Sequence, residues 1–172
     1  MNPERPTLEE HLPYFSRYID LVPEGDINTL LESQLMPFEA KLRALSADQL
    51  QHRYAPEKWN TLQIIKHLSD TERVFSYRAV HFARGDSSPL PSFDQDTWLK
   101  QTTSQDLDRL LLEWQSVRQS AVYLFSSLDG AAWLRRGTAS GHPMSSRACA
   151  YIIVGHLMYH QELLRQKYGL AV

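Results

Sequence analysis

The chain has 172 residues, with 18 basic and 20 acidic residues and a formal net charge of −2. This length is enough to bury one core without disulfides, so we expect a single domain. The balanced charge gives no reason to expect nucleic acid or an anionic membrane as a partner. Cys149 is the only cysteine, which rules out an internal disulfide and favours a reducing compartment. The first ten residues lack the apolar segment of a secretory signal, and the longest apolar run is too short to span a bilayer, so we expect a cytoplasmic protein.

Apolar residues recur at helical spacing from the start of the chain. A short helix is expected from Leu8 to Tyr18, followed by a long amphipathic helix over residues 26–45 with Asp26 as its N-cap. Pro37 lies inside this second helix. Because proline lacks a backbone donor, we expect the helix to bend there.

Three further long helices are expected, each with a recognisable start. The first has an asparagine and a glutamine at the spacing of a capping box, and it ends at a glycine. The last also ends at a glycine. The expected helices, with the residues at their starts, are 60–85 (Asn60, Gln63), 107–128 (Thr103, Asp106) and 145–169 (Ser145).

The segments between these helices have the composition of loops. Residues 85–98 are rich in proline and serine, residues 129–144 separate the last two helices, and no stretch alternates between polar and apolar residues as a strand would. The pattern predicts an all-α fold, a four-helix bundle with a short extra N-terminal helix. Its single domain would cover residues 1–172, with a core from about residue 26 to residue 169.

Two histidines on the last helix are candidates for metal binding. His156 and His160 are four residues apart, so they share a helix face and can converge on one ion. His67 borders the apolar stripe of the helix expected over residues 60–85, and bundles build metal sites from facing helices. Three protein ligands would leave coordination positions open, as in catalytic sites. The alternative for each histidine is a buried polar residue that pairs with a backbone carbonyl.

Two segments carry a resemblance to a known family. They are WNTLQIIKHLSDTERVFSYR and GHLMYHQELL, and in this order and separation they resemble the DinB/YfiT-like superfamily of metalloenzymes. The connecting segment FDQDTW is also similar to the family's loop. One position departs from the pattern, because Gln63 stands where the family has glutamate; either side chain can complete the capping box. The matching residues are Trp59, His67, Leu68, Asp70, Glu72, Arg73, His156 and His160.

The resemblance implies a fold, a site and a range of activities. The family fold is a four-helix bundle that binds a divalent metal through three histidines, here His67, His156 and His160. Zinc or nickel is the expected ion. Characterised members act as transferases or isomerases that use low-molecular-weight thiols, and the family also suggests a homodimer. Since one fold hosts many reactions, the resemblance does not fix the substrate.

An open site of three imidazoles supports more than one reaction. A metal ion there would lower the pKa of a bound water and would equally deprotonate a bound thiol. Leu157 follows His156, so the metalloprotease sequence HExxH is absent and peptide hydrolysis is disfavoured. The family resemblance alone leads us to expect a thiol-dependent S-transferase acting on a small molecule. The alternatives are a metal-dependent hydrolase, a non-catalytic metal-binding or stress-response module, and a helical interaction protein without a metal.

Other residues are weaker candidates for the site. Glu72 and Arg73 could contact substrate, but a pair of this kind more often bridges helices. Cys149 could line the cavity, but a buried position in the core is the expected role for a helical cysteine. His142 could approach the site from its loop, although a solvated position is the default. Trp114 is expected in the core. The remaining candidates, left open as pocket or anion-binding residues, are Trp98, Trp133, Arg135 and Arg136.

Overall fold

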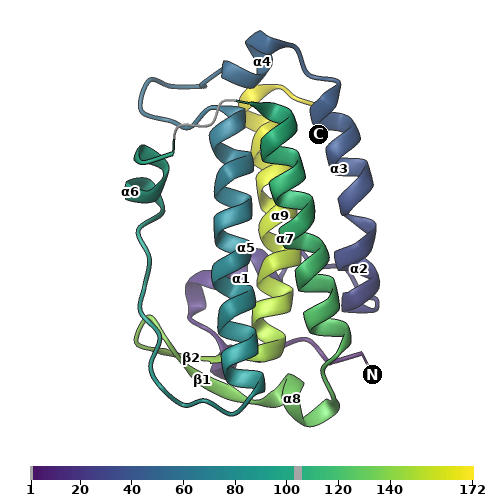
Figure 1. Ribbon diagram of the computed structural model, residues 1–172, viewed down its shortest axis with the longest axis vertical. Coiled ribbons are helices and arrows are strands. Elements are labelled where there is room, and N and C mark those ends of the chain that lie inside the picture. Colours follow the sequence, from purple (N-terminus) through teal and green to yellow (C-terminus); the bar gives the residue numbers. More distant parts are fainter. Residues whose placement is uncertain (1, 103–105) are drawn as a thin grey trace.

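The protein is described here by a computed structural model that covers residues 2–102 and 106–172. Figure 1 shows a bundle of long helices, with a hairpin and a short helix at one end and α4 at the other. One of the four bundle helices is broken into two segments, so the bundle is formed by α2 (Ile27–Ser33) with α3 (Leu35–Arg43), α5 (Thr61–Ala83), α7 (Leu107–Ser126) and α9 (Ser146–Tyr168). The predicted four-helix bundle is therefore confirmed.

The caps predicted for the long helices are also confirmed within the described residues. Asn60 caps α5 by accepting a hydrogen bond from the Gln63 backbone, and the Gln63 side chain bonds the Asn60 backbone in return. Ser145 caps α9, and Gly169 ends it with a φ of 69°, a conformation that glycine adopts without strain. Asp106 caps α7, whereas Thr103 lies outside the described residues.

The predicted bend at Pro37 appears as a break between α2 and α3. The helix is interrupted at Gln34, one turn before the proline, because Pro37 has no N–H for the carbonyl of Ser33. The Gln34 side chain uses this position to reach two other bundle helices. Its amide nitrogen donates to the Val154 carbonyl of α9 at 3.1 Å, and its oxygen accepts from Arg118 of α7 at 2.8 Å.

Both connections expected to be irregular contain regular structure, so that part of the prediction is wrong. In the first, Asp94 caps a short helix, α6 (Gln95–Lys100). The second holds α8 (Gly130–Leu134) and an antiparallel hairpin of β1 (Arg136–Ala139) and β2 (His142–Ser145). These strands have four residues each and pack only partly against the core, so their sequence shows no alternation over a useful length.

The N-terminal segment is less helical than predicted. The expected helix over residues 8–18 is divided into the 3-10 turns Leu8–Glu10 and Pro13–Phe15 and one α-helical turn, α1 (Ser16–Ile19). Leu12 precedes a proline, which disfavours the helical conformation at that residue. The segment nevertheless packs across α9, as Figure 1 shows, and places Tyr18 beside it.

Two apolar clusters form the core and divide the bundle along its length. One lies toward the hairpin and includes Phe75, Phe125 and Trp133, while the other lies toward α4 (Ala47–Gln51) and includes Phe38 and Trp114. Among the described residues, no helix combines the length and apolarity needed to cross a bilayer. Several polar side chains of α5 and α9 are also buried within this largely apolar interior.

Candidate metal centre

Three histidine side chains from two helices meet inside the bundle. His67 lies in the second turn of α5, and His156 and His160 lie one turn apart on α9. The Nε2 atom of His156 is 3.0 Å from that of His67 and 3.1 Å from that of His160. All three residues are buried, each about 5% exposed. The structure thus brings together the three residues predicted from sequence, while their role as ligands stays a prediction.

The surroundings of these rings favour the neutral form that binds metals. Burial lowers the pKa of His67 to about 4. Burial and the neighbouring imidazoles also hold the pKa values of His156 and His160 well below the ordinary value. Neutral imidazole carries a free lone pair, so no proton has to be displaced at neutral pH.

The hydrogen bonds of the three histidines differ from those expected of buried histidines that pair with backbone carbonyls. In the described part of the chain, none of the three rings bonds a backbone carbonyl, and Nδ1 of His160 is buried without a partner. Nδ1 of His67 lies 3.3 Å from the hydroxyl of Thr71. Buried polar atoms are normally paired, so nitrogens that converge on one another are typical of side chains that share a metal ion.

The spacing of the three nitrogens fits a first-row divalent ion. Two nitrogens that each bind one ion at roughly 2.0–2.1 Å lie about 2.8–3.4 Å apart for angles between about 90° and 109°. The observed separations of 3.0 and 3.1 Å fall within that range. In the described residues no carboxylate or thiol joins the group, so an ion would keep its full positive charge.

Aromatic rings fix the orientation of the imidazoles. Tyr18 packs edge to face on His156 with 5.1 Å between ring centroids, and Trp59 lies 4.7 Å from His67. Close approach of Tyr18 depends on Gly155, because a Cβ at this position would lie 2.0 Å from the Tyr18 carbonyl oxygen. The residue before His156 therefore admits the chain segment that covers it.

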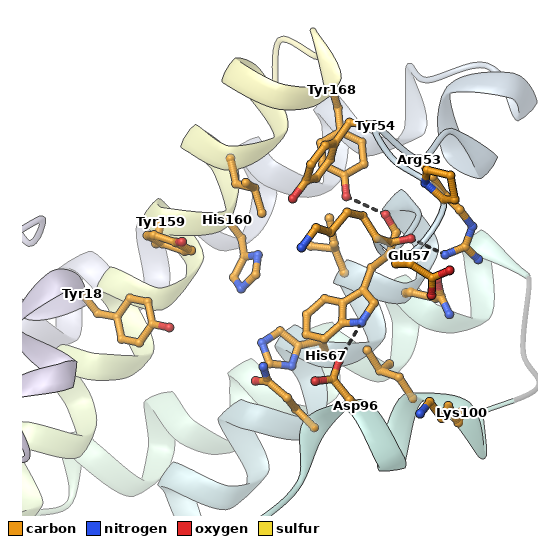
Figure 2. Close-up of a pocket in the computed structure, with 18 of the residues that line it drawn as sticks. Tyr18, Arg53, Tyr54, Glu57, His67, Asp96, Lys100, Tyr159, His160 and Tyr168 are labelled. Atoms are coloured by element: carbon orange, nitrogen blue, oxygen red, sulfur yellow. Dashed lines mark hydrogen bonds between the residues drawn. The ribbon is translucent and has the colours of Figure 1, made fainter.

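An open cleft of about 650 Å³ leads from the cluster to solvent. Figure 2 shows His67 and His160 at one end, with the Tyr18 hydroxyl directed toward them, and Arg53, Glu57 and Lys100 farther out. A second cavity of about 410 Å³ also reaches the cluster, where it is lined by His67 and His156. His67 thus borders both spaces.

Several weaker candidates prove to be structural. Glu72 forms a buried ion pair with Arg118 of α7 at 2.6 Å, while Arg73 bridges to Glu113 of α7 at 2.6 Å. Cys149 is fully buried among apolar side chains, and burial raises the pKa of its thiol to about 12. These outcomes agree with the helix-bridging and core roles expected from sequence.

The remaining candidates lie away from the cluster. His142 is exposed on β2, at the end of the bundle opposite α4, so the suggested approach to the site is wrong. Arg135 donates to the Ala83 carbonyl, and Arg136 lies 3.7 Å from Glu10, so neither lines the cleft. Trp114 and Trp133 are buried in the core, whereas Trp98 is 43% exposed and borders a separate depression.

Comparisons with known proteins agree with this architecture. The family model of the DinB superfamily matches residues 30–164. The chain belongs to the DinB superfamily. A solved structure of YfiT from Bacillus subtilis is similar over 91% of this chain and 93% of its own, with a TM-score of 0.72 and 16% identity. YfiT is described as "a probable metal-dependent hydrolase with an unusual four-helix bundle topology". No similar sequence was found among curated proteins.

The aromatic and cationic lining of this DinB site was not predicted from the sequence. Tyr18 and Tyr159 flank the histidines, and Arg53, Lys58 and Lys100 line the cleft. Tyr159 directly precedes His160, which is a usable signal. The others come from irregular or short segments whose position depends on how the chain folds around the bundle.

Proposed function

We propose that this DinB protein is a cytoplasmic metal-dependent enzyme that binds Zn²⁺ or Ni²⁺ through His67, His156 and His160. The main support is that three neutral, buried imidazoles converge beside an open cleft. The Nε2 atom of His156 lies 3.0 Å from that of His67 and 3.1 Å from that of His160. Such an ion supplies Lewis acidity, which lowers the pKa values of thiols and of water. Because its three protein ligands are uncharged, the site favours an anionic partner.

The favoured reaction is transfer of a low-molecular-weight thiol to an electrophilic small molecule. Two cavities reach the cluster and share lining residues that include Tyr18 and His67, an arrangement suited to two substrates. Arg53, Lys58 and Lys100 line the larger cleft and can contact the carboxylates that such thiols carry. In the transfer, the thiolate sulfur forms a bond to carbon while the leaving group departs with its electron pair.

Metal-dependent hydrolysis is the second candidate. It is favoured by the structural similarity to YfiT and its description, and water needs less space than a thiol cosubstrate. In the larger cleft the acidic residues are Glu57 and Asp96. Asp96 accepts a hydrogen bond from the Trp59 indole at 3.2 Å, so this carboxylate is already engaged.

Metal content is the first test. Untagged native protein should contain about one divalent ion per chain, and His156→Ala should lose it while far-ultraviolet circular dichroism stays unchanged. His52→Ala is the matched control, since His52 is exposed and remote from the cluster on α4's C-terminal side. Full occupancy in His156→Ala would overturn the ligand assignment.

Activity assays separate the reactions. Metal-loaded protein should conjugate a thiol such as glutathione or cysteine to an aryl or alkyl halide with release of the halide ion, and chelation should abolish turnover. Ester or amide hydrolysis without added thiol would favour the hydrolase instead. Bound metal with neither activity would indicate the non-catalytic alternative. The homodimer expected from the family stays a prediction, to be tested by sedimentation of the native protein.

A further inference from the structure

The second cavity ends at a buried arginine that the proposed chemistry does not use. Arg78 lies on α5, eleven residues after His67, about 16 Å along the helix axis at roughly 1.5 Å per residue. His67, Thr71, Phe75 and Arg78 follow one another at steps of four, four and three residues, so they lie along one face. All four line this cavity, and Arg78 is only 2% exposed.

The charge of Arg78 has no protein counter-ion. In the described residues no carboxylate lies within ion-pair distance of it; its Nη2 atom donates to the Pro91 carbonyl at 2.9 Å and to the Ser140 hydroxyl at 3.0 Å. No hydrogen bond from Nε or Nη1 is formed within the same residues. Burial lowers the pKa of the guanidinium, as expected when desolvation is not offset by an acid.

The other buried arginines show how this fold usually treats such a charge. Arg118 is paired with Glu72 at 2.6 Å, and Arg147 is paired with Glu10 at 2.7 Å. Asp94 does line the cavity of Arg78, but both of its oxygens are committed to the first turn of α6. A buried charge without a partner is costly, so its retention beside a cavity indicates a ligand that supplies the anion.

The walls between the two ends restrict the ligand further. Phe75 and Phe93 place their rings 5.1 and 6.0 Å from the guanidinium carbon, and Phe15 packs edge to face on Phe75. These side chains give the middle of the cavity an aromatic lining, and its volume of about 410 Å³ suits a small molecule. The histidine cluster lies at the opposite end.

We propose that Arg78 binds the carboxylate of an elongated, largely apolar substrate whose reactive end lies at the histidine cluster. The assignment rests on the proposed function for the reaction at that end, whereas anion binding by Arg78 is independent of it. The carboxylate-bearing molecule would be the electrophile, and the thiol would enter by the larger cleft. Two entrances would then keep the two substrates apart until they meet beside His67.

Calorimetric titration with two matched probes tests this assignment. The probes are 4-phenylbutyrate and its uncharged analogue 4-phenylbutyramide, titrated into chelator-treated protein so that the acid cannot bind a metal. Because a hydrogen bond to a charged group contributes about 1.5–3 kcal/mol, the acid should bind at least tenfold more tightly than the amide. Equal affinities, or no saturable binding of either probe, would overturn the proposal.

Substitutions of Arg78 test whether this residue causes the preference for the acid over the amide. Arg78→Met should bind the two probes equally, and Arg78→Lys should keep a weakened preference for the acid. Arg84→Met is the matched control, because Arg84 is exposed at the end of the same helix, and it should bind as wild type does. A preference that persists in Arg78→Met would refute the assignment. If Arg78→Met does not fold, two other measurements test the assignment. A preference for the acid in Arg78→Lys that is as large as in wild type, or equal binding of the two probes by wild type, would refute it.

Carboxylate binding by Arg78 can be tested independently of metal binding by the histidines. His160→Ala should also lose the metal, and because His160 does not line this cavity, the variant should keep its preference for the acid. Conversely, Arg78→Met should keep a full complement of metal. Loss of the preference in His160→Ala, with its fold intact, would place the carboxylate at the histidines and overturn the proposal.

Discussion

Helix α5 carries buried polar groups on two sides, and the two sides are satisfied differently. Toward α7, the Glu72 carboxylate accepts two hydrogen bonds from Arg118, whose third nitrogen donates to Leu31 and Gln34. Toward α9, His67 meets other imidazoles and no group of opposite charge. The first cluster is complete without a ligand and joins helices. The second has no such partner within the described residues, and the proposed metal ion would supply it.

Breaking the Glu72–Arg118 pair should give the largest loss of stability. Glu72→Ala leaves a guanidinium that is 1% exposed without its carboxylate, so the free energy of unfolding should fall by about 3–5 kcal/mol. Urea denaturation measures the change. Glu113→Ala is the control, since this residue also bridges α5 and α7 but is partly exposed, and it should cost no more than about 1 kcal/mol. Equal losses would show that the buried pair has no special structural role.

A second complete pair should make stability depend on pH. Burial would raise the pKa of Glu10, but hydrogen bonds from Arg147 and Thr7 outweigh it and lower the pKa to about 2. Since the folded pKa lies below the ordinary 4.5, the unfolded state binds more protons as the pH falls. The pair should therefore contribute about 3 kcal/mol above pH 4.5, and this contribution should be lost toward pH 2.

Comparison with Glu10→Gln isolates this effect from the other carboxylates. Urea denaturation at several pH values should show wild type more stable than the variant near pH 6, with the two converging near pH 2. A constant difference across that range would mean that the Glu10 carboxylate does not titrate with folding.

On the α9 side, the packing that covers the histidines should be sensitive to a single methyl group. Gly155→Ala would place a Cβ 2.0 Å from the Tyr18 carbonyl oxygen and push α1 outward. In an ordinary helix interior this change stabilises by about 1 kcal/mol, so a loss of about 1–3 kcal/mol in thermal or urea unfolding is diagnostic of the clash. Unchanged or raised stability would show that the segment carrying Tyr18 moves freely over the site.

The same contrast explains how far the sequence could predict this molecule. Helix ends were predictable because Asn60, Ser145 and Gly169 act on their immediate neighbours. The histidine cluster was predictable because helical spacing joins His156 to His160 and His67 borders the apolar stripe of another bundle helix; the family resemblance then supported the same three residues.

Partners set by tertiary packing could not be predicted. Arg118 and Arg78 have similar surroundings in sequence, yet one is paired with Glu72 and the other faces a cavity. The hairpin was missed for the same reason, because its four-residue strands are held by contacts such as the backbone bonds between Leu90 and residues 138 and 140. Local sequence carries no record of these distant contacts.

The smallest expected effect lies at the contact between Thr71 and His67. If the Thr71 hydroxyl accepts the Nδ1 proton at 3.3 Å, it keeps Nε2 free for a metal. Thr71→Val preserves the shape and removes the acceptor, so metal affinity should fall about tenfold, equivalent to about 1.4 kcal/mol, with little change in the stability of the metal-free protein. Competition with a chromogenic chelator measures the affinity. Ser69→Ala is the control, because Ser69 is also buried on α5 but bonds the Ile65 carbonyl. If both variants retain wild-type affinity, Thr71 only fills space, and the orientation of His67 comes from Trp59 and the neighbouring imidazoles.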